Sequence, residues 1–91
     1  MNLVEEQQRG HEAELLLNNP LHKAAFDADF DAIIAAMLAS AFGDEKTHNR
    51  LVIALQMLYR RENRYKEFVT TGKMAAIQVK GGAVMKIQGI A

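Results

Sequence analysis

The 91-residue sequence contains no cysteine, no tryptophan, one proline and one serine. Without cysteine the chain forms neither disulfide bonds nor thiolate metal sites, and small secreted domains usually depend on one of these. The single serine, Ser40, lies in an alanine-rich stretch and not in the Gly-x-Ser-x-Gly turn of serine hydrolases. We therefore expect an intracellular protein that has no catalytic nucleophile.

The sequence also lacks a long apolar run. Its longest uncharged apolar stretch, Ala32 to Phe42, is about half of the roughly 20 residues that a membrane-spanning helix needs. The first residues, Met1 to Glu6, open acidic and lack the basic region and apolar core of a signal peptide. We expect a chain that neither spans a membrane nor is exported by that route.

Patterns typical of metal, phosphate or cofactor sites are missing as well. The three histidines, at positions 11, 22 and 48, do not show the i, i+4 spacing that places two ligands on one helix face. No Gly-Lys-Ser/Thr motif follows Gly81-Gly82, so this pair does not begin a phosphate-binding loop. The sequence predicts no catalytic residues, no metal site, no cofactor and no enzymatic activity.

The residues that are present predict one small, mainly α-helical domain. Hydrophobic residues make up 49% and charged residues 24% of the chain, the balance of an ordinary folded protein. Asn18-Asn19 before Pro20 predicts a helix start, because asparagine caps helices and the first helical position tolerates proline. Apolar residues then recur at spacings of three and four as far as Ala41, and Gly43 predicts the stop.

A second long helix is predicted from the caps at Asp44, Glu45 and Thr47 to Gly72. Apolar residues continue the helical period through this range at Leu51, Leu55, Leu58, Tyr65 and Val69. The short connection between the two long helices predicts an antiparallel helical hairpin. A shorter helix over 12–17 precedes it, and Gly10 weakens any helix before that point.

The last twenty residues change from the helical period to alternation. Apolar and polar residues alternate on both sides of Gly81-Gly82, which is typical of a β-hairpin, whereas residues 73–80 are also compatible with a short helix. We predict a helical domain over 1–73 and an extended or β-hairpin tail over 74–91. An isolated two-stranded hairpin is only marginally stable, so the tail needs a covering surface, either on its own helices or on a partner. The partner-binding residues predicted for the tail are Ile77, Val79, Met85, Ile87 and Ile90.

The net charge of zero conceals an asymmetry between the two halves. Residues 1–46 hold three Lys or Arg and nine Asp or Glu, whereas residues 47–91 hold eight and two. The basic residues of the second helix that are candidates for phosphate or intersubunit contacts are Arg60, Arg61, Arg64 and Lys66. Antiparallel pairing within the chain is the alternative, and it places Asp27 opposite Asn63, Asp29 near Arg61 and Asp31 near Arg60. Three interpretations stay open: pairing within the chain, pairing between subunits, and nucleic-acid binding.

Three segments carry a resemblance to a known group of proteins: AELLLNNPLHKAAF over 13–26, Arg50 with Ala54-Leu55-Gln56, and Gly72-Lys73-Met74-Ala75. With these segments the sequence resembles small helical proteins of tailed bacteriophages and prophages that are encoded near head and packaging genes. The resemblance covers roughly residues 12–76 and implies a role with phage structural proteins, in the virion or in the host cytoplasm. Together with the patterns above it predicts a non-enzymatic, homo-oligomeric, protein-binding component of phage particle assembly. The alternative is a small DNA-binding or DNA-packaging factor that uses the basic residues of the second long helix.

Overall fold

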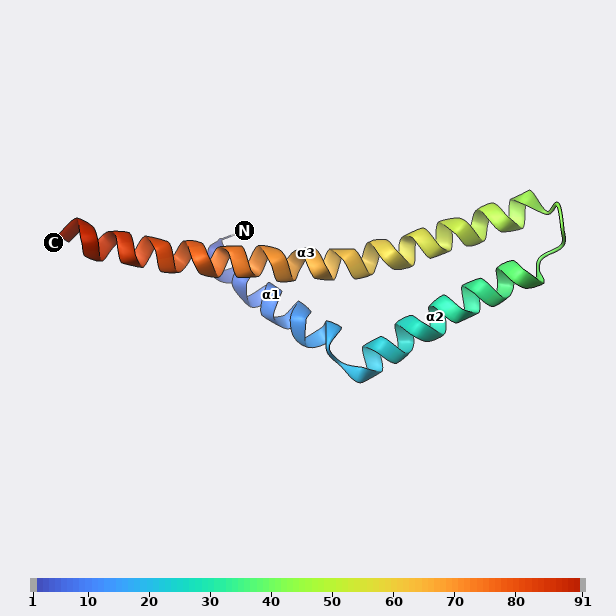
Figure 1. The fold of residues 1–91 in the computed structure, drawn as a ribbon, viewed down its shortest axis with the longest axis horizontal. Helices are drawn as coiled ribbons and strands as arrows, with labels where there is room; N and C mark the ends of the chain where they lie inside the picture. Colours follow the sequence, from blue (N-terminus) through green and yellow to red (C-terminus); the bar gives the residue numbers. More distant parts are fainter. Residues whose placement is uncertain (1, 91) are drawn as a thin grey trace. The chain divides into compact units, whose positions relative to one another are not determined.

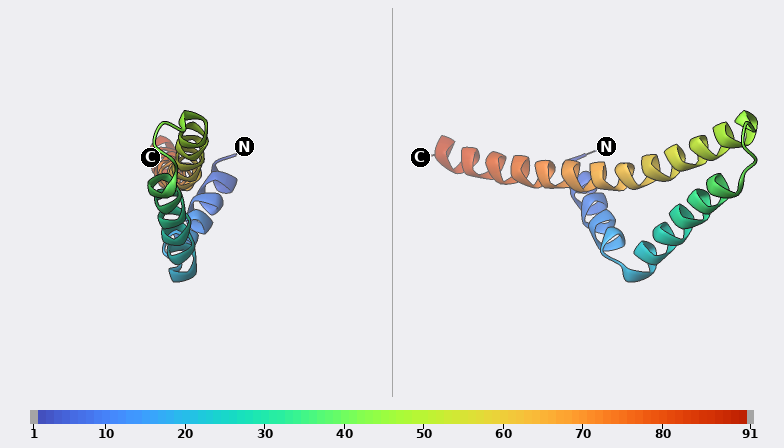
Figure 2. Two further views of the ribbon diagram at one scale, coloured as in Figure 1. Left: turned by 90° about the vertical axis from the view of Figure 1, so that its right-hand side faces the viewer. Right: turned by 45° about the vertical axis from the view of Figure 1, so that its right-hand side comes forward.

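The computed structural model describes residues 2–90, and their side chains as far as Gly81. This part of the chain forms three α-helices, α1 (Leu3–Leu17), α2 (Pro20–Ala39) and α3 (Glu45–Ile90), and no strand (Figure 1). The predicted mainly helical class is therefore confirmed. Figure 2 shows the same helices from two further directions.

The helices form two packing units. Among the described residues, 2–17 pack with 64–90, and 18–63 pack among themselves. We call the first the α1–α3 unit and the second the α2–α3 unit. Because α3 belongs to both, the predicted division between residues 73 and 74 falls inside this helix, and that division stays a prediction.

The start of α2 lies where the sequence predicts it. The Asn19 side-chain oxygen accepts hydrogen bonds from the backbone N–H groups of Leu21 and His22 at 2.8 and 3.4 Å, and Pro20 takes the first helical position. The predicted stop at Gly43 is wrong by four residues, since α2 ends at Ala39. The Ser40 hydroxyl donates to the Met37 carbonyl at 2.7 Å and thereby replaces a helical bond. Gly43 does adopt the left-handed conformation, with φ of 86°, in the loop that follows.

The start of α3 is capped by Asp44. Its carboxylate accepts hydrogen bonds from the backbone N–H of Thr47 at 3.1 Å and from the Thr47 hydroxyl at 2.7 Å. The bond from the Thr47 hydroxyl, followed by the one from the Thr47 backbone, lowers the pKa of Asp44 below 3.8. This anchoring confirms the predicted start near Asp44 and Glu45.

The other end of α3 differs from the prediction. Gly72 does not end the helix, and α3 continues through the predicted tail to Ile90, so the predicted β-hairpin is not confirmed. One glycine inside a helix costs only about 1 kcal/mol relative to alanine, and strong helix formers such as Ala75 and Ala76 follow Gly72. The helix over residues 73–80 agrees with the alternative that the sequence left open.

The α1–α3 unit is built on close approach of two backbones. A Cβ atom added at Gly10 would lie 2.6 Å from the Phe68 carbonyl oxygen and 2.8 Å from the Gly72 Cα. Beside this contact the side chains of Ala13 and Ala75 are 5% and 1% exposed. Small residues thus let α1 and α3 touch, which explains why α1 continues through Gly10 to Leu3, nine residues before its predicted start.

The α2–α3 unit is built on larger side chains. The rings of Phe26 and Phe30 meet the ring of Tyr59 edge to face, with centroids 5.9 and 6.2 Å apart. His22 contacts Glu62 at 2.8 Å between Nε2 and Oε1, and both side chains are mostly buried. These contacts join the first half of α2 to the end of that part of α3, residues 45–63, which belongs to this unit. The two helices therefore pack antiparallel. Leu58, 7% exposed, is the one buried large hydrophobic residue among the described side chains.

Candidate protein-binding surfaces

Large apolar side chains lie mainly on the surface of the described part of the chain. The buried hydrophobic residues there are Ala13, Leu58 and Ala75, and no large side chain is fully buried. Exposed large hydrophobic residues occur on every helix and in the loop before α3. The most exposed in the α2–α3 unit are Leu21, Leu38, Phe42, Ile53 and Met57. So much uncovered apolar surface is typical of an interaction site.

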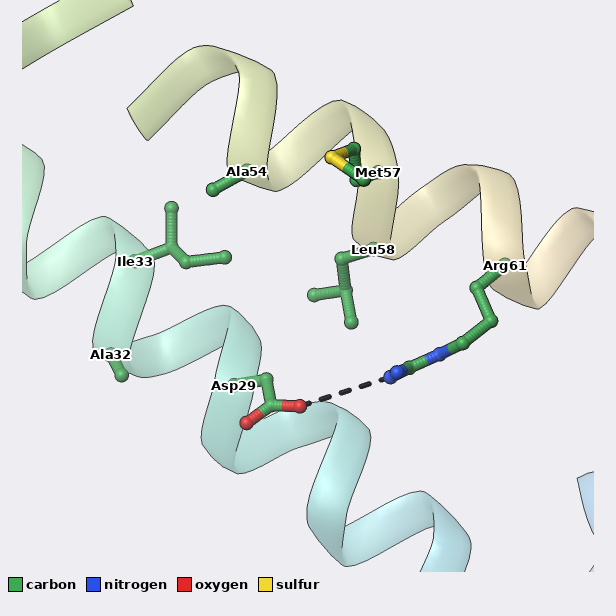
Figure 3. A pocket seen from close by; sticks show the side chains of 7 residues that line it. All are labelled: Asp29, Ala32, Ile33, Ala54, Met57, Leu58 and Arg61. Atoms are coloured by element: carbon green, nitrogen blue, oxygen red, sulfur yellow. Dashed lines mark ion pairs between the residues drawn. The ribbon is translucent and has the colours of Figure 1, made fainter. Parts of the chain in front are cut away.

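A groove runs along one face of the α2–α3 unit (Figure 3). Its volume is about 480 Å³, and it is lined by Asp29, Ala32 and Ile33 of α2 and by Ala54, Met57, Leu58 and Arg61 of α3. Arg61 Nη2 lies 3.8 Å from Asp29 Oδ2, an ion pair in which both side chains are more than half exposed. Ala32 and Ala54 contribute only a methyl group each to its two walls.

A second pocket, of about 710 Å³, lies at the turn between α2 and α3. Its apolar lining includes Met37, Leu38 and Phe42, and its polar lining includes Ser40 and His48. The Ser40 hydroxyl is within hydrogen-bond distance of His48 Nε2 and also donates to the Met37 carbonyl. The donor and acceptor roles in the Ser40–His48 contact depend on the tautomer of His48, and the contact links the end of α2 to the first turn of α3.

The predicted tail residues do not gather into one patch. Ile77 is 69% exposed and Val79 is 42% exposed, as partner-binding residues should be. Two residues along a helix are about 200° apart, so α3 places Ile77 and Val79 on opposite faces, and Met74 shares a face with Ile77 instead. Met85, Ile87 and Ile90 lie outside the side chains that the structure describes.

The four predicted basic residues are exposed along α3, and two of them have acidic partners. Arg61 pairs with Asp29, which confirms that part of the predicted antiparallel pairing. Arg64 Nε lies 3.7 Å from Glu67 Oε2 on the same helix. Arg60 and Lys66 are exposed, and the predicted Asp31–Arg60 ion pair is not formed in the described part of the chain.

The described residues contain no group of three or more His, Cys, Asp or Glu side chains placed to hold a metal ion. None of the helices, as far as they are described, combines the length and apolarity that crossing a bilayer requires.

The sequence predictions missed the groove of the α2–α3 unit. The signal for it is a row of residues at spacings of four and three, Ala25, Asp29, Ala32, Ala36 and Ala39, beside the row that packs on α3. Alanine is weakly hydrophobic and common in helices, so this row does not stand out as a second apolar face.

Comparison with known proteins adds no relative, since no family model, no curated protein and no solved structure matches this sequence.

Proposed function

We propose that this chain is a non-enzymatic, protein-binding accessory or structural component of phage particle assembly that works as a homo-oligomer. One observation carries the protein-binding part: among the described side chains, Leu58 is the single large hydrophobic residue that is buried. Small domains with so little core commonly gain stability by oligomerisation. The phage assignment is supported by the sequence resemblance over roughly residues 12–76 and places the chain in the virion or the host cytoplasm.

The proposed architecture is an antiparallel helical hairpin preceded by a shorter helix and followed by a binding tail. Antiparallel contacts such as His22–Glu62 support the hairpin. In the described part of the tail, Met74 and Ile77 share one exposed face of α3. We propose that this face, which includes the predicted partner-binding residue Ile77, contacts a phage structural protein.

A pull-down of the tagged full chain from a phage-producing lysate, read by mass spectrometry, tests this proposal. Ile77→Lys with Met74→Lys should remove the captured phage structural proteins, because it places two charges in the proposed contact. Gln78→Lys, an exposed substitution in the same segment, is the matched control and should leave capture unchanged. Equal capture by the wild type and the double variant would reject the assigned face.

DNA binding through Arg60, Arg61, Arg64 and Lys66 is the competing function. Two of these four residues already face carboxylates, which reduces the charge available to phosphates. Affinity for duplex DNA measured at increasing salt separates the two functions, because phosphate contacts weaken steeply with salt. Tight, salt-sensitive DNA binding together with failed capture of structural proteins would favour the competing function.

A further inference from the structure

The helical period extends the lining of the groove in the α2–α3 unit into two rows of residues, one on each helix. The row on α2 is Ala25, Asp29, Ala32, Ala36 and Ala39, and the row on α3 is Thr47, Arg50, Ala54, Met57 and Arg61. Both rows alternate spacings of four and three, so each forms a nearly straight line along its helix. All of these residues are exposed except Thr47 and Ala54, which are half-buried.

The two helices carry opposite charge. α2 has three aspartates, at 27, 29 and 31, against one lysine, Lys23. The α3 segment over 45–63 has Lys46, Arg50, Arg60 and Arg61 against Glu45 and Glu62. Within the two rows, α2 contributes only negative charge and α3 only positive charge. A surface that complements this face must place basic groups over α2 and acidic groups over α3.

We propose that a second copy of this chain packs on this face, with each α2 lying beside α3 of the other copy in an antiparallel four-helix bundle. A two-fold axis parallel to the helices produces this arrangement. It preserves the register seen within the hairpin, so Asp29 lies level with Arg61 of its own chain and with Arg61 of the second copy. The Asp29 and Arg61 side chains of the two copies then form a ring at this level in which negative and positive charges alternate.

The alternative dimer, with α2 beside α2, is disfavoured by the same charges. It packs the two α2 rows, which carry Asp29, against each other and the two α3 rows, which carry Arg50 and Arg61, against each other, so no charge of one copy faces an opposite charge of the other. The bundle with α2 beside α3 also suits the shapes of the rows. Met57, which is 65% exposed, is the one long apolar side chain among them, and opposite it lies the flat surface around Ala32.

The α2–α3 unit buries few large hydrophobic side chains, and association with a second copy would bury more. The 46 residues over 18–63 bury one large hydrophobic side chain, Leu58, and chains of about that size usually need a staple or a partner. Closing a second copy over the groove would cover Ile33, Met57 and the alanines. This inference rests on the proposed function in that it names one of the protein partners, a second copy, and the surface that binds it.

A charge exchange between two full-length variants tests the arrangement. Asp29→Arg puts four arginines at one level of the proposed bundle, and Arg61→Asp puts four aspartates there, so each variant alone should dissociate in sedimentation experiments. Mixing the two should restore the dimer, because the two arginines that one variant carries at this level then face the two aspartates of the other. Pairing confined to a single chain gives no recovery on mixing, and that result would overturn the proposal.

A steric pair of variants keeps the test independent of charge. Ala32→Gln fills the groove and should weaken self-association by about tenfold or more, whereas Ala24→Gln, at an exposed position of α2 that does not line the groove, should not change it. Circular dichroism at high concentration checks that both variants are helical. Equal dimerisation by both, or a wild-type chain that stays monomeric, would overturn the proposed interface. A dimer that captures no phage protein would reject the proposed function and leave this interface intact.

Discussion

The two units of this small protein hold α3 by opposite means. In the α1–α3 unit the contact is made by the absence of side chains, at Gly10 and Gly72, and the backbones touch. In the α2–α3 unit aromatic, leucine and histidine side chains separate the helices and leave a groove along one face. Larger side chains should therefore lower the stability of the α1–α3 unit, and smaller side chains should lower the stability of the α2–α3 unit. The second unit is also the one that our proposal completes with a second copy of the chain.

Removing atoms from the α2–α3 unit should have the largest effect. Leu58→Ala deletes most of its one buried large hydrophobic side chain and should lower the free energy of unfolding by about 2–4 kcal/mol. Urea unfolding followed by circular dichroism measures this loss. Met57→Ala, at the neighbouring exposed position, is the control and should cost much less when the protein is monomeric. Equal losses would mean that Leu58 is not the core of this unit.

Breaking the polar contact of the same unit should come next. His22→Leu leaves the buried Glu62 carboxylate without its 2.8 Å partner and should cost about 2 kcal/mol. Adding Glu62→Leu to the same chain should recover most of that loss, since an apolar pair of similar volume needs no hydrogen bond. If the double variant is as unstable as the sum of the two single variants, the contact does not couple these residues.

Adding atoms to the α1–α3 unit should destabilise it despite a better helix propensity. Gly72→Ala places a Cβ atom 2.8 Å from the Gly10 Cα and should cost about 1–2 kcal/mol. Gly81→Ala is the matched control, because nothing lies within 4 Å of an added Cβ there. It should stabilise α3 by about 0.5–1 kcal/mol. The opposite signs of the two substitutions would separate close packing from propensity, and two stabilised variants would contradict the close crossing.

The smallest predicted effect is the pH dependence of the cap at Asp44. Hydrogen bonds from Thr47 lower the pKa of this carboxyl in the folded state below 3.8. Its stabilising contribution is thus present above pH 3.8 and is lost as the pH falls through the lowered value. The stability difference between the wild type and Asp44→Asn should shrink over that acidic range. A constant difference would show that the cap does not depend on the charge.

The sequence predicted those features that depend on local chemistry. Asn19 before Pro20 and Asp44 before Thr47 mark helix starts because each cap acts within three residues, and both lie where expected. The Asp29–Arg61 pair followed from the antiparallel register alone. Contacts between distant segments were not predictable in this way. Gly10 and Gly72 were interpreted as weak points of helices, because nothing local reveals that each is the other's packing partner.

The candidate surfaces show the same difference between local features, which were predictable, and contacts between helices, which were not. Exposure of Ile77 and Val79 agrees with their predicted role, but the helical conformation separates them onto two faces, which an alternating pattern conceals. The groove between α2 and α3 was missed because its walls are alanines, whose individual contribution to a hydrophobic pattern is small. Its position follows only once the pairing of the two helices is known.

Thermal unfolding of the full chain at a series of concentrations tests most directly whether this protein completes its core with another chain. Association of folded chains stabilises them by mass action, so the melting temperature should rise steadily with concentration. Ala32→Gln should flatten this dependence, and Ala24→Gln should preserve it. A melting temperature that is the same at every concentration would contradict the account, because it would show that one chain folds with all of its stabilising contacts already made.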